Sequence, residues 1–324
     1  MAMVPSFATR SKSLCARRAR RRRTTGGSVA RPTAPEGSPV FTANTLQGQT
    51  ILITGGGSGL GRAMAERFAQ LGAKVAILGR RAEPLTQTVE TIVKSGGTAA
   101  WASCDVRDPL ACAAAVDALE AELGPVTDLV NNAAGNFLAP TEDLSANAFN
   151  SVVQIVLGGT FHMTTDAGRR WIDRRCGGNI LSIVTTYAWT GSAFVVPSAC
   201  AKAGVLAMTK SLAVEWATYG IRCNAIAPGP FQTEGAFSRL MPEVMQATAL
   251  EQIPLGRFGR PYELADLATF MLSPLSSYMT GECVVLDGGE HLRVGQEFSG
   301  MTQMPRAELK HALAQLRPQK QEKR

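Results

Sequence analysis

Near the middle of the sequence, a phenol, a hydroxyl and an ammonium group come close together along the chain. Ser198 and Lys202 are four residues apart, so on a helix they would share one face. Tyr187 stands eleven residues before Ser198 and is expected in the loop after a buried strand. The candidate acid and the candidate lysine therefore come from different elements. The alternatives are a packed aromatic for Tyr187, a helix cap after Pro197 for Ser198 and an ordinary surface-helix lysine for Lys202.

A glycine-rich segment joins the apolar run 51–54 to a helical pattern over 62–71. Glycines permit a tight turn and a close approach of the backbone, and free N–H groups at a helix start favour a pyrophosphate. A turn with a purely structural role is the alternative. The residues that we expect to contact a nucleotide cofactor here are Gly55, Gly57, Ser58, Gly59, Leu60 and Gly61.

The end of the expected second strand indicates which cofactor the chain prefers. An NAD site favours a carboxylate at this place, whereas this chain has Gly79, Arg80 and Arg81. A guanidinium can pair with a 2′-phosphate, so the pattern favours NADP(H), unless the arginines are simply solvated at a helix start. Asp105, at the end of the third strand, is placed to accept a hydrogen bond from the adenine amino group or to cap a helix.

The elements that must position these residues alternate along the chain. Short β-branched runs are separated by segments with helical spacing, and parallel neighbours require such crossovers. The pattern predicts an α/β fold, a single Rossmann-type doubly wound parallel sheet of about seven strands with helices on both faces. The expected strands are 50–54, 74–78, 99–104, 128–131, 179–184, 222–227 and 283–286.

Composition and charge limit the remaining possibilities. The net charge of +7 comes from nine basic residues among the first 35; without them the chain carries about −2, so we expect no nucleic-acid partner. We expect a basic, disordered extension over 1–43, an NADP-binding Rossmann-type domain over 44–292 and a C-terminal extension over 293–324. The first segment matches a mitochondrial transit peptide in composition or stems from a misplaced start, so the expected location is the cytoplasm or the mitochondrial matrix.

Cysteine and histidine usage argues against metal chemistry. The seven cysteines contain no CxxC pair, which fits a reducing compartment, and three scattered histidines offer no ligand cluster, so we assign no metal. No apolar run approaches eighteen residues, so we expect a soluble protein without an integral membrane segment.

In this order, the motifs resemble those of the short-chain dehydrogenases/reductases over roughly residues 45–290. The resemblance rests on the glycine-rich turn, Asp105, the run 131–135, Lys202, Pro228–Gly229 and 287–289. Members of this family normally carry an Asn-Ser-Tyr-Lys set. This chain keeps the lysine but has Val156, Thr185 and Ser198 at the other three places, so it lacks the usual proton donor to a carbonyl oxygen.

The same departures occur together in the mitochondrial-type 2,4-dienoyl-CoA reductases, which this chain resembles over 131–137, 194–199, 228–230 and 235–240. The resemblance implies NADPH-dependent reduction of a 2,4-dienoyl-CoA to a 3-enoyl-CoA, a step in fatty acid β-oxidation. Such a reaction places negative charge on the thioester oxygen, and Tyr187 and Asn136 are the expected donors to it. Lys202 would hold the nicotinamide ribose, and Ser198 would bond to the cofactor or near Tyr187.

The resemblance also implies further contacts. Cofactor contacts are expected from Pro228, Gly229, Pro230, Phe231 and Thr233. Substrate contacts are expected from Arg107, Phe137, Ser145 and Arg239, of which Arg239 lies in an apolar lid over 233–255. Members of this family are usually dimers or tetramers, so a homo-oligomer is expected. The alternatives are a trans-2-enoyl-CoA reductase, a carbonyl reductase, which predicts tyrosine at position 198, and a cofactor-binding sensor without turnover.

Overall fold

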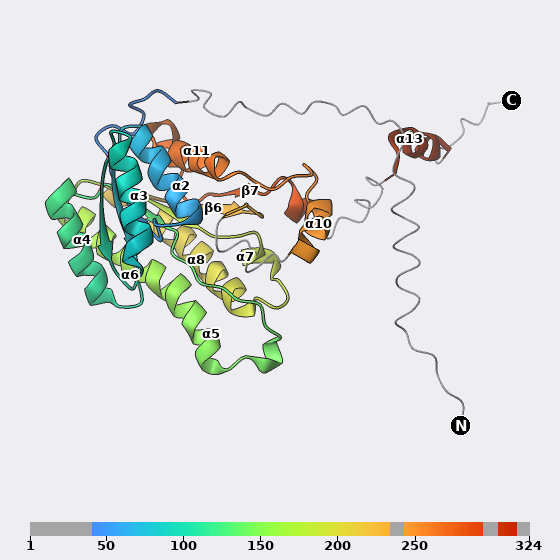
Figure 1. Ribbon diagram of the computed structural model, residues 1–324, viewed down its shortest axis with the longest axis horizontal. Coiled ribbons are helices and arrows are strands. Elements are labelled where there is room, and N and C mark those ends of the chain that lie inside the picture. The colour runs from blue at the N-terminus through green and yellow to red at the C-terminus, as the bar shows by residue number, and fades with distance from the viewer. Residues whose placement is uncertain (1–40, 234–242, 294–303, 316–324) are drawn as a thin grey trace. The chain divides into compact units, whose positions relative to one another are not determined.

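The computed structural model describes residues 41–233, 243–293 and 304–315, and within them one seven-stranded parallel sheet forms the centre of the fold (Figure 1). The strand order is β3-β2-β1-β4-β5-β6-β7. The predicted fold class is confirmed, and every strand end lies within one residue of its predicted place. The strands are β1 (Thr50–Thr54), β2 (Lys74–Gly79), β3 (Thr98–Ser103), β4 (Asp128–Asn131), β5 (Gly178–Ile183), β6 (Ile221–Pro228) and β7 (Cys283–Leu286).

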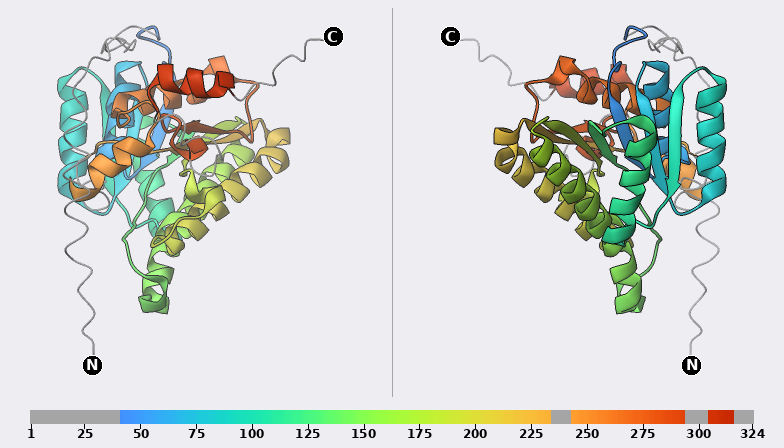
Figure 2. Two further views of the ribbon diagram at one scale, coloured as in Figure 1. Left: turned by 90° about the vertical axis from the view of Figure 1, so that its right-hand side faces the viewer. Right: turned by 90° about the vertical axis from the view of Figure 1, so that its left-hand side faces the viewer.

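Helices cover both faces of the sheet (Figure 2). The longer helices are α2 (Gly59–Gln70), α3 (Ala82–Lys94), α4 (Pro109–Leu123), α5 (Ala146–Val153), α6 (Gly159–Arg174), α8 (Val196–Glu215), α10 (Glu243–Gln252), α11 (Pro261–Leu272) and α13 (Arg306–Gln315). The shorter ones are α7 (Tyr187–Thr190) and α12 (Glu290–Arg293). The described residues therefore form the layered α/β arrangement that alternating strands and helices require.

Alternation along the strands decides which helices pack on which face. Ile51 and Ile53 belong to a core with α2, α3 and α11, while Leu52 belongs to the opposite core with α4 and α6. All three side chains are fully buried, as expected for strands covered on both faces. A third cluster joins α5 and α8 to β6. The two sides of the sheet thus hold the strand ends, and the loops that follow them, in fixed positions.

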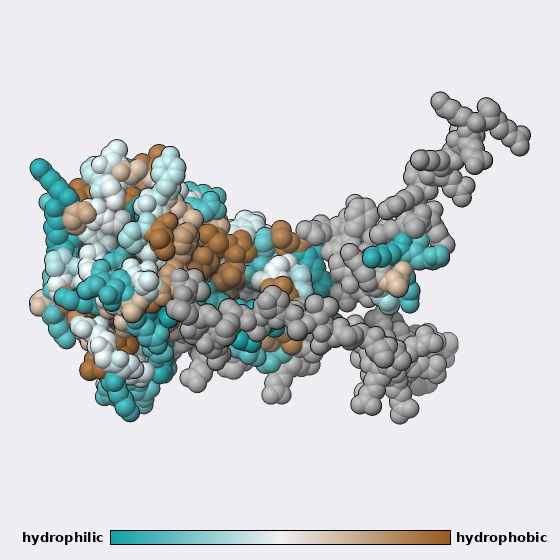
Figure 3. All heavy atoms as spheres, turned by 90° about the horizontal axis from the view of Figure 1, so that it is seen from above, coloured by the Kyte–Doolittle hydropathy of each residue, from teal (hydrophilic) through white to brown (hydrophobic). Residues whose placement is uncertain are grey.

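Two local details of the helices differ from the predictions. Helix α2 begins at Gly59 rather than Arg62, so the last glycines of the turn already form its first turn. Between α5 and α6 the chain makes a π-helical segment over Gln154–Gly158. Single π-turns inside helices are rare and are often found at functional sites. Figure 3 shows hydrophobic residues gathered on one area of the face seen from above.

Candidate active site

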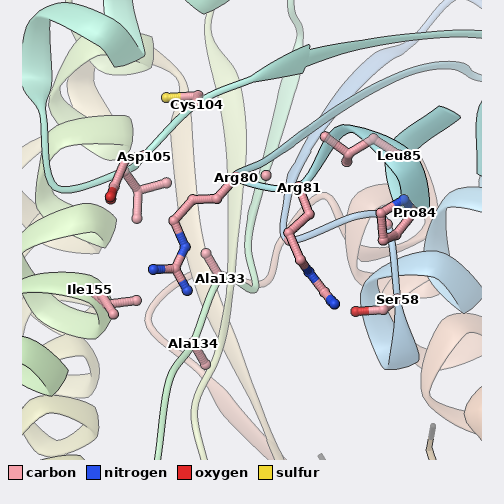
Figure 4. A pocket seen from close by; sticks show the side chains of 14 residues that line it. Ser58, Arg80, Arg81, Pro84, Leu85, Cys104, Asp105, Ala133, Ala134 and Ile155 are labelled. Atoms are coloured by element: carbon pink, nitrogen blue, oxygen red, sulfur yellow. The ribbon is translucent and has the colours of Figure 1, made fainter. Parts of the chain in front are cut away.

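A cavity of about 410 Å³ lies where β1, β2, β3 and β4 end (Figure 4). The carboxyl ends of parallel strands are where sheets of this kind bind ligands. Of the predicted cofactor residues, this cavity contains Gly55, Gly57, Ser58, Arg80 and Asp105. Gly79 and Arg81, which the sequence analysis weighed together with Arg80, also line it. The sequence interpretation assigned no contact to the rest of the lining, namely Pro84, Leu85, Cys104, Val106, Ala133, Ala134 and Ile155.

The glycine-rich turn has the geometry that a nucleotide site requires. Gly55 has a φ of +70°, a conformation that favours glycine. A Cβ on Gly61 would lie 2.2 Å from the Gly55 carbonyl oxygen, so only glycine lets the first turn of α2 pack against the loop. Asn132 holds the turn from the next strand end, since its side-chain nitrogen donates to the carbonyls of Thr54 and Gly55 at 3.0 and 3.3 Å. The cradle thus fits a pyrophosphate at the start of α2.

Arg80 and Arg81 extend into the cavity from the end of β2 (Figure 4). Both residues are exposed, and neither guanidinium forms an ion pair or hydrogen bond with another described residue. The cavity therefore contains two guanidiniums without a hydrogen-bond partner among the described residues and, beside them, a carboxylate that is already paired. That pair is Asp105 with Arg107, whose Nη2 lies 2.5 Å from Oδ2, and this contact lowers the pKa of Asp105, which the charge of Arg80 also lowers.

The Asp105–Arg107 ion pair differs from the contacts that the sequence analysis expected of each residue. Asp105 accepts from the side chain and the backbone N–H of Arg107, and it does not cap α4, whose N-cap is Asp108. The helix-cap alternative for Asp105 is therefore wrong. We expected Arg107 to contact the phosphates of the substrate, but its guanidinium is paired with Asp105, two residues away.

Tyr187 is the centre of a hydrogen-bonded chain of side chains. Its hydroxyl lies 3.1 Å from the Ser198 hydroxyl and accepts a hydrogen bond from the Asn136 amide at 3.4 Å. The backbone N–H of Phe137 donates to the Asn136 side-chain oxygen at 2.9 Å, which fixes the amide with its nitrogen toward the phenol. Three residues from three separate segments thus meet, as the sequence interpretation expected of Tyr187 and Asn136.

Two predictions about these residues are corrected by the structure. Tyr187 does not sit in an irregular loop but begins the single-turn helix α7, whose N-cap is Thr186. Ser198 lies inside the first turn of α8, which is capped at Val195, and it is 2 % exposed. The cap reading of Ser198 is wrong because Pro197 is already helical, so the hydroxyl is left to bond Tyr187.

Lys202 is not an ordinary surface lysine. It is 7 % exposed, and its ammonium donates to the Ile183 carbonyl at 2.5 Å, so it ties α8 to the last residue of β5. Burial lowers the pKa of Lys202 to about 8, because desolvation disfavours the charged form. A buried ammonium with a single backbone partner retains donors for a ligand.

The π-helical segment borders the same region. Val156, at the place where the family normally has asparagine, is fully buried within it, and the preceding Ile155 lines the cavity. A Cβ on Gly159 would lie 2.4 Å from the Val106 side chain, so α6 can approach the strand-end loop only with glycine there. The sequence analysis did not predict this irregularity.

The remaining predicted residues lie in the loops and helix ends around the strand ends. Ser145 is the N-cap of α5, and its hydroxyl accepts from the Ala148 N–H at 3.1 Å. Phe137 is 37 % exposed, whereas Phe231 is buried. After β6, which ends at Pro228, the backbone N–H of Gly229 donates to the Leu286 carbonyl, and Pro230 follows. The Thr233 side chain lies close to Gly59, the first residue of α2, and Leu60 is the second residue of that helix. Arg239 lies outside the described residues, as do 234–242 of the predicted lid and 1–40 of the N-terminal extension.

Phe194 adds an exposed apolar group beside these loops. It is 58 % exposed and has a φ of +64°, a backbone conformation that is uncommon for a bulky residue. Its carbonyl accepts from the Ala139 N–H at 3.0 Å, which joins the loop before α8 to the loop that carries Asn136.

A search of the described residues finds no group of three or more His, Cys, Asp or Glu side chains that could hold a metal ion. Within the same residues, no helix is both long and apolar enough to cross a bilayer.

A parallel sheet, a glycine turn at its switch point with a cavity at the strand ends, and a buried lysine held on the last residue of β5 are the features of a Rossmann-type oxidoreductase that uses a nicotinamide cofactor. The chain belongs to the short-chain dehydrogenase/reductase family. Residues 55–291 match the family model described as Enoyl-(Acyl carrier protein) reductase. The predicted family is therefore confirmed.

Named relatives cover most of the chain. A probable 2,4-dienoyl-CoA reductase 3 [(3E)-enoyl-CoA-producing] from Caenorhabditis elegans is 46 % identical over 78 % of this chain and 84 % of its own length. A probable 2,4-dienoyl-CoA reductase [(2E)-enoyl-CoA-producing] from Bacillus subtilis is 45 % identical over 76 % of this chain and 98 % of its own. The crystal structure of a putative 2-deoxy-d-gluconate 3-dehydrogenase from Agrobacterium tumefaciens with bound NADP superimposes with a TM-score of 0.71, at 33 % identity over 77 % and 99 % of the two chains.

Proposed function

We propose that this protein reduces 2,4-dienoyl-CoA thioesters to 3-enoyl-CoA with NADPH. The observation that carries the proposal is the hydrogen-bonded chain Asn136–Tyr187–Ser198, with Lys202 one helical turn beyond Ser198. This arrangement supports a role for the Tyr187 phenol at an oxygen of the substrate, although the tyrosine position typical of the family is occupied by serine. The names of the two dienoyl-CoA reductase relatives support the same reaction.

The hydrogen-bond directions suggest how the phenol works. Asn136 donates to the Tyr187 oxygen, and Ser198 is close enough to donate to it as well. With both donors engaged, the phenol proton is free to point at the thioester oxygen. Reduction at the far end of the conjugated diene moves negative charge onto that oxygen, where a preorganised donor lowers the barrier most.

Bound NADPH supplies the hydride. The residues that would hold it are the glycine-rich turn at its pyrophosphate, Arg80 at its 2′-phosphate and Lys202 at its nicotinamide ribose. The adenine and nicotinamide ends of NADPH would lie along one edge of the sheet. The cavity is at the carboxyl ends of β1 to β4, and the Lys202 ammonium reaches the last residue of β5.

The test measures NADPH oxidation with a 2,4-dienoyl-CoA, a trans-2-enoyl-CoA and a 3-ketoacyl-CoA in parallel. We expect turnover of the diene, and ¹H NMR of the product should show an isolated double bond between carbons 3 and 4. Protonation of the intermediate at carbon 4 would give the conjugated 2-enoyl ester instead, the product named for the Bacillus relative. Absence of diene-dependent oxidation would reject the proposal.

A trans-2-enoyl thioester reductase is the second candidate, and the description of the matching family model favours it. It predicts that the singly unsaturated ester is turned over at a rate comparable with the diene. Offering the same acyl chain on CoA and on acyl carrier protein would show which carrier the site accepts.

Arg80→Ala should weaken the preference for NADPH over NADH. Arg80 lines the cavity without a carboxylate partner, so its guanidinium is available to a 2′-phosphate. We expect the ratio of the KM values to change roughly tenfold, at the lower end for a charged hydrogen bond because the residue is exposed to water and salt. Arg81→Ala is the matched control, with a smaller change expected. Equal effects of Arg80→Ala on both cofactors would contradict the phosphate role.

A further inference from the structure

Two buried cysteines face each other at the edge of the nucleotide cavity. Cys104 follows β3, and Cys112 lies in the first turns of α4. Their sulfur atoms are 3.8 Å apart, and the residues are 4 % and 0 % exposed. Nothing in the proposed reduction of the dienoyl group uses either thiol.

The backbone holds both cysteines in place. The N–H of Cys104 donates to the Gly79 carbonyl at 2.9 Å, directly before Arg80, and the N–H of Cys112 donates to the Asp108 carbonyl at 3.0 Å. The Cys112 thiol lies 3.7 Å from the Val106 carbonyl, so the loop between the two cysteines folds over them. A disulfide needs sulfurs about 2.05 Å apart, so they would have to approach by about 1.8 Å.

The two thiols differ in access. Cys104 lines the cavity, whereas Cys112 does not. A small oxidant that enters the cavity therefore meets Cys104 first. A nucleotide whose adenine lies beside Asp105, the next residue, would cover it.

We propose that Cys104 and Cys112 are a reversible dithiol–disulfide site, oxidised by hydroperoxides that enter the nucleotide cavity, reduced again by small thiols through thiol–disulfide exchange, and protected by bound cofactor. The protection rests on the proposed NADPH site, whereas the bridge itself does not. Closure would pull the segment 104–108 toward α4 and would displace Asp105 together with its partner Arg107. The oxidised protein should therefore bind NADPH more weakly.

The chemistry balances with one hydroperoxide. The Cys104 thiolate attacks a peroxide oxygen and the O–O bond breaks, which gives a sulfenic acid and, after protonation, water when the oxidant is hydrogen peroxide. The Cys112 sulfur then attacks the sulfenic sulfur, an S–S bond forms, the S–O bond breaks and a second water leaves. Two thiols are oxidised by two electrons in total, and the peroxide is reduced by two. The neighbouring Cys112 thiol lowers the pKa of Cys104, which favours Cys104 as the attacking thiolate.

The test uses the full-length reduced protein and hydrogen peroxide, followed by alkylation of the remaining thiols. Trypsin cleaves after Arg107, between the two cysteines, so a bridge appears as peptide 95–107 joined to peptide 108–169 in mass spectrometry. We expect this pair in the nucleotide-free protein, its loss after dithiothreitol, and its absence from Cys112→Ala, a variant that should keep the activity of the reduced enzyme.

NADP⁺ is the protecting probe, since it is not itself a reductant. At about ten times its Kd only about a tenth of the molecules keep an open cavity, so bridging should slow about tenfold. The exposed Cys176 and Cys200 are internal controls whose oxidation should not change. Oxidation of these two without any joined peptide would overturn the bridge, and undiminished bridging in protein shown to bind NADP⁺ would overturn the protection. The bridge is decided in nucleotide-free protein even if NADP⁺ fails to bind, a failure that would count against the proposed cofactor instead.

Discussion

Tyr187→Phe is expected to lower kcat for the 2,4-dienoyl-CoA roughly 10²- to 10³-fold, about the effect of removing one oxyanion donor. The ring and its packing remain, but Asn136 and Ser198 lose the oxygen that they both reach. The KM for NADPH should stay near its original value, because the phenol acts on the substrate oxygen. Steady-state kinetics with the diene at saturating NADPH measure the change.

Tyr219→Phe is the matched control, since Tyr219 is 50 % exposed and ends a 3-10 turn after α8. It should leave kcat unchanged. If Tyr187→Phe retained full kcat while Ser198→Ala lost it, the acid would be Ser198 and the assigned role of the phenol would be wrong.

Lys202→Met should lower kcat/KM for NADPH roughly 10- to 150-fold at pH 7, the loss of a charged hydrogen bond worth about 1.5–3 kcal/mol. Methionine keeps an unbranched apolar side chain at this buried position of α8 but removes the ammonium that donates to the Ile183 carbonyl. Circular dichroism before and after the change should show an unaltered fold, which separates a lost ligand contact from misfolding.

The same lysine predicts a pH dependence. Its pKa is lowered to about 8, so the ammonium is present below pH 8 and is lost as the pH rises through that value. In wild-type enzyme, kcat/KM for NADPH, which reports the free enzyme, should therefore fall on the alkaline side near pH 8. Lys202→Met should be low and flat over the same range. An unchanged alkaline limb in the variant would show that another group titrates.

The sequence predicted the inner strands well because they are covered on both faces, as β1 is along its whole length. Ile51, Leu52 and Ile53 are apolar whichever way they point, so a short uninterrupted apolar run before a glycine turn has one consistent structure. The glycine-rich turn was also readable, because the positive φ of Gly55 and the close approach of Gly61 to the Gly55 carbonyl both require glycine.

The site was less readable where tertiary contacts decide the outcome. Nothing local distinguishes Lys202 from a surface lysine, and only the packing of α8 on β5 buries it. The pairing of Asp105 with Arg107 competes with the adenine and phosphate partners that each was expected to meet. The π-helical turn at Gln154–Gly158 also escaped prediction, because periodicity alone does not distinguish it from regular helix.

The unpaired guanidiniums of Arg80 and Arg81 also affect how quickly ligands arrive. Two positive charges over a recess attract anions from several ångströms away, and this attraction fades as ions shorten the Debye length. Polyanions such as free CoA and inorganic pyrophosphate should therefore compete for entry in dilute buffer far more than at physiological ionic strength. Association rates for the dinucleotide measured at low salt would overstate the rate inside a cell.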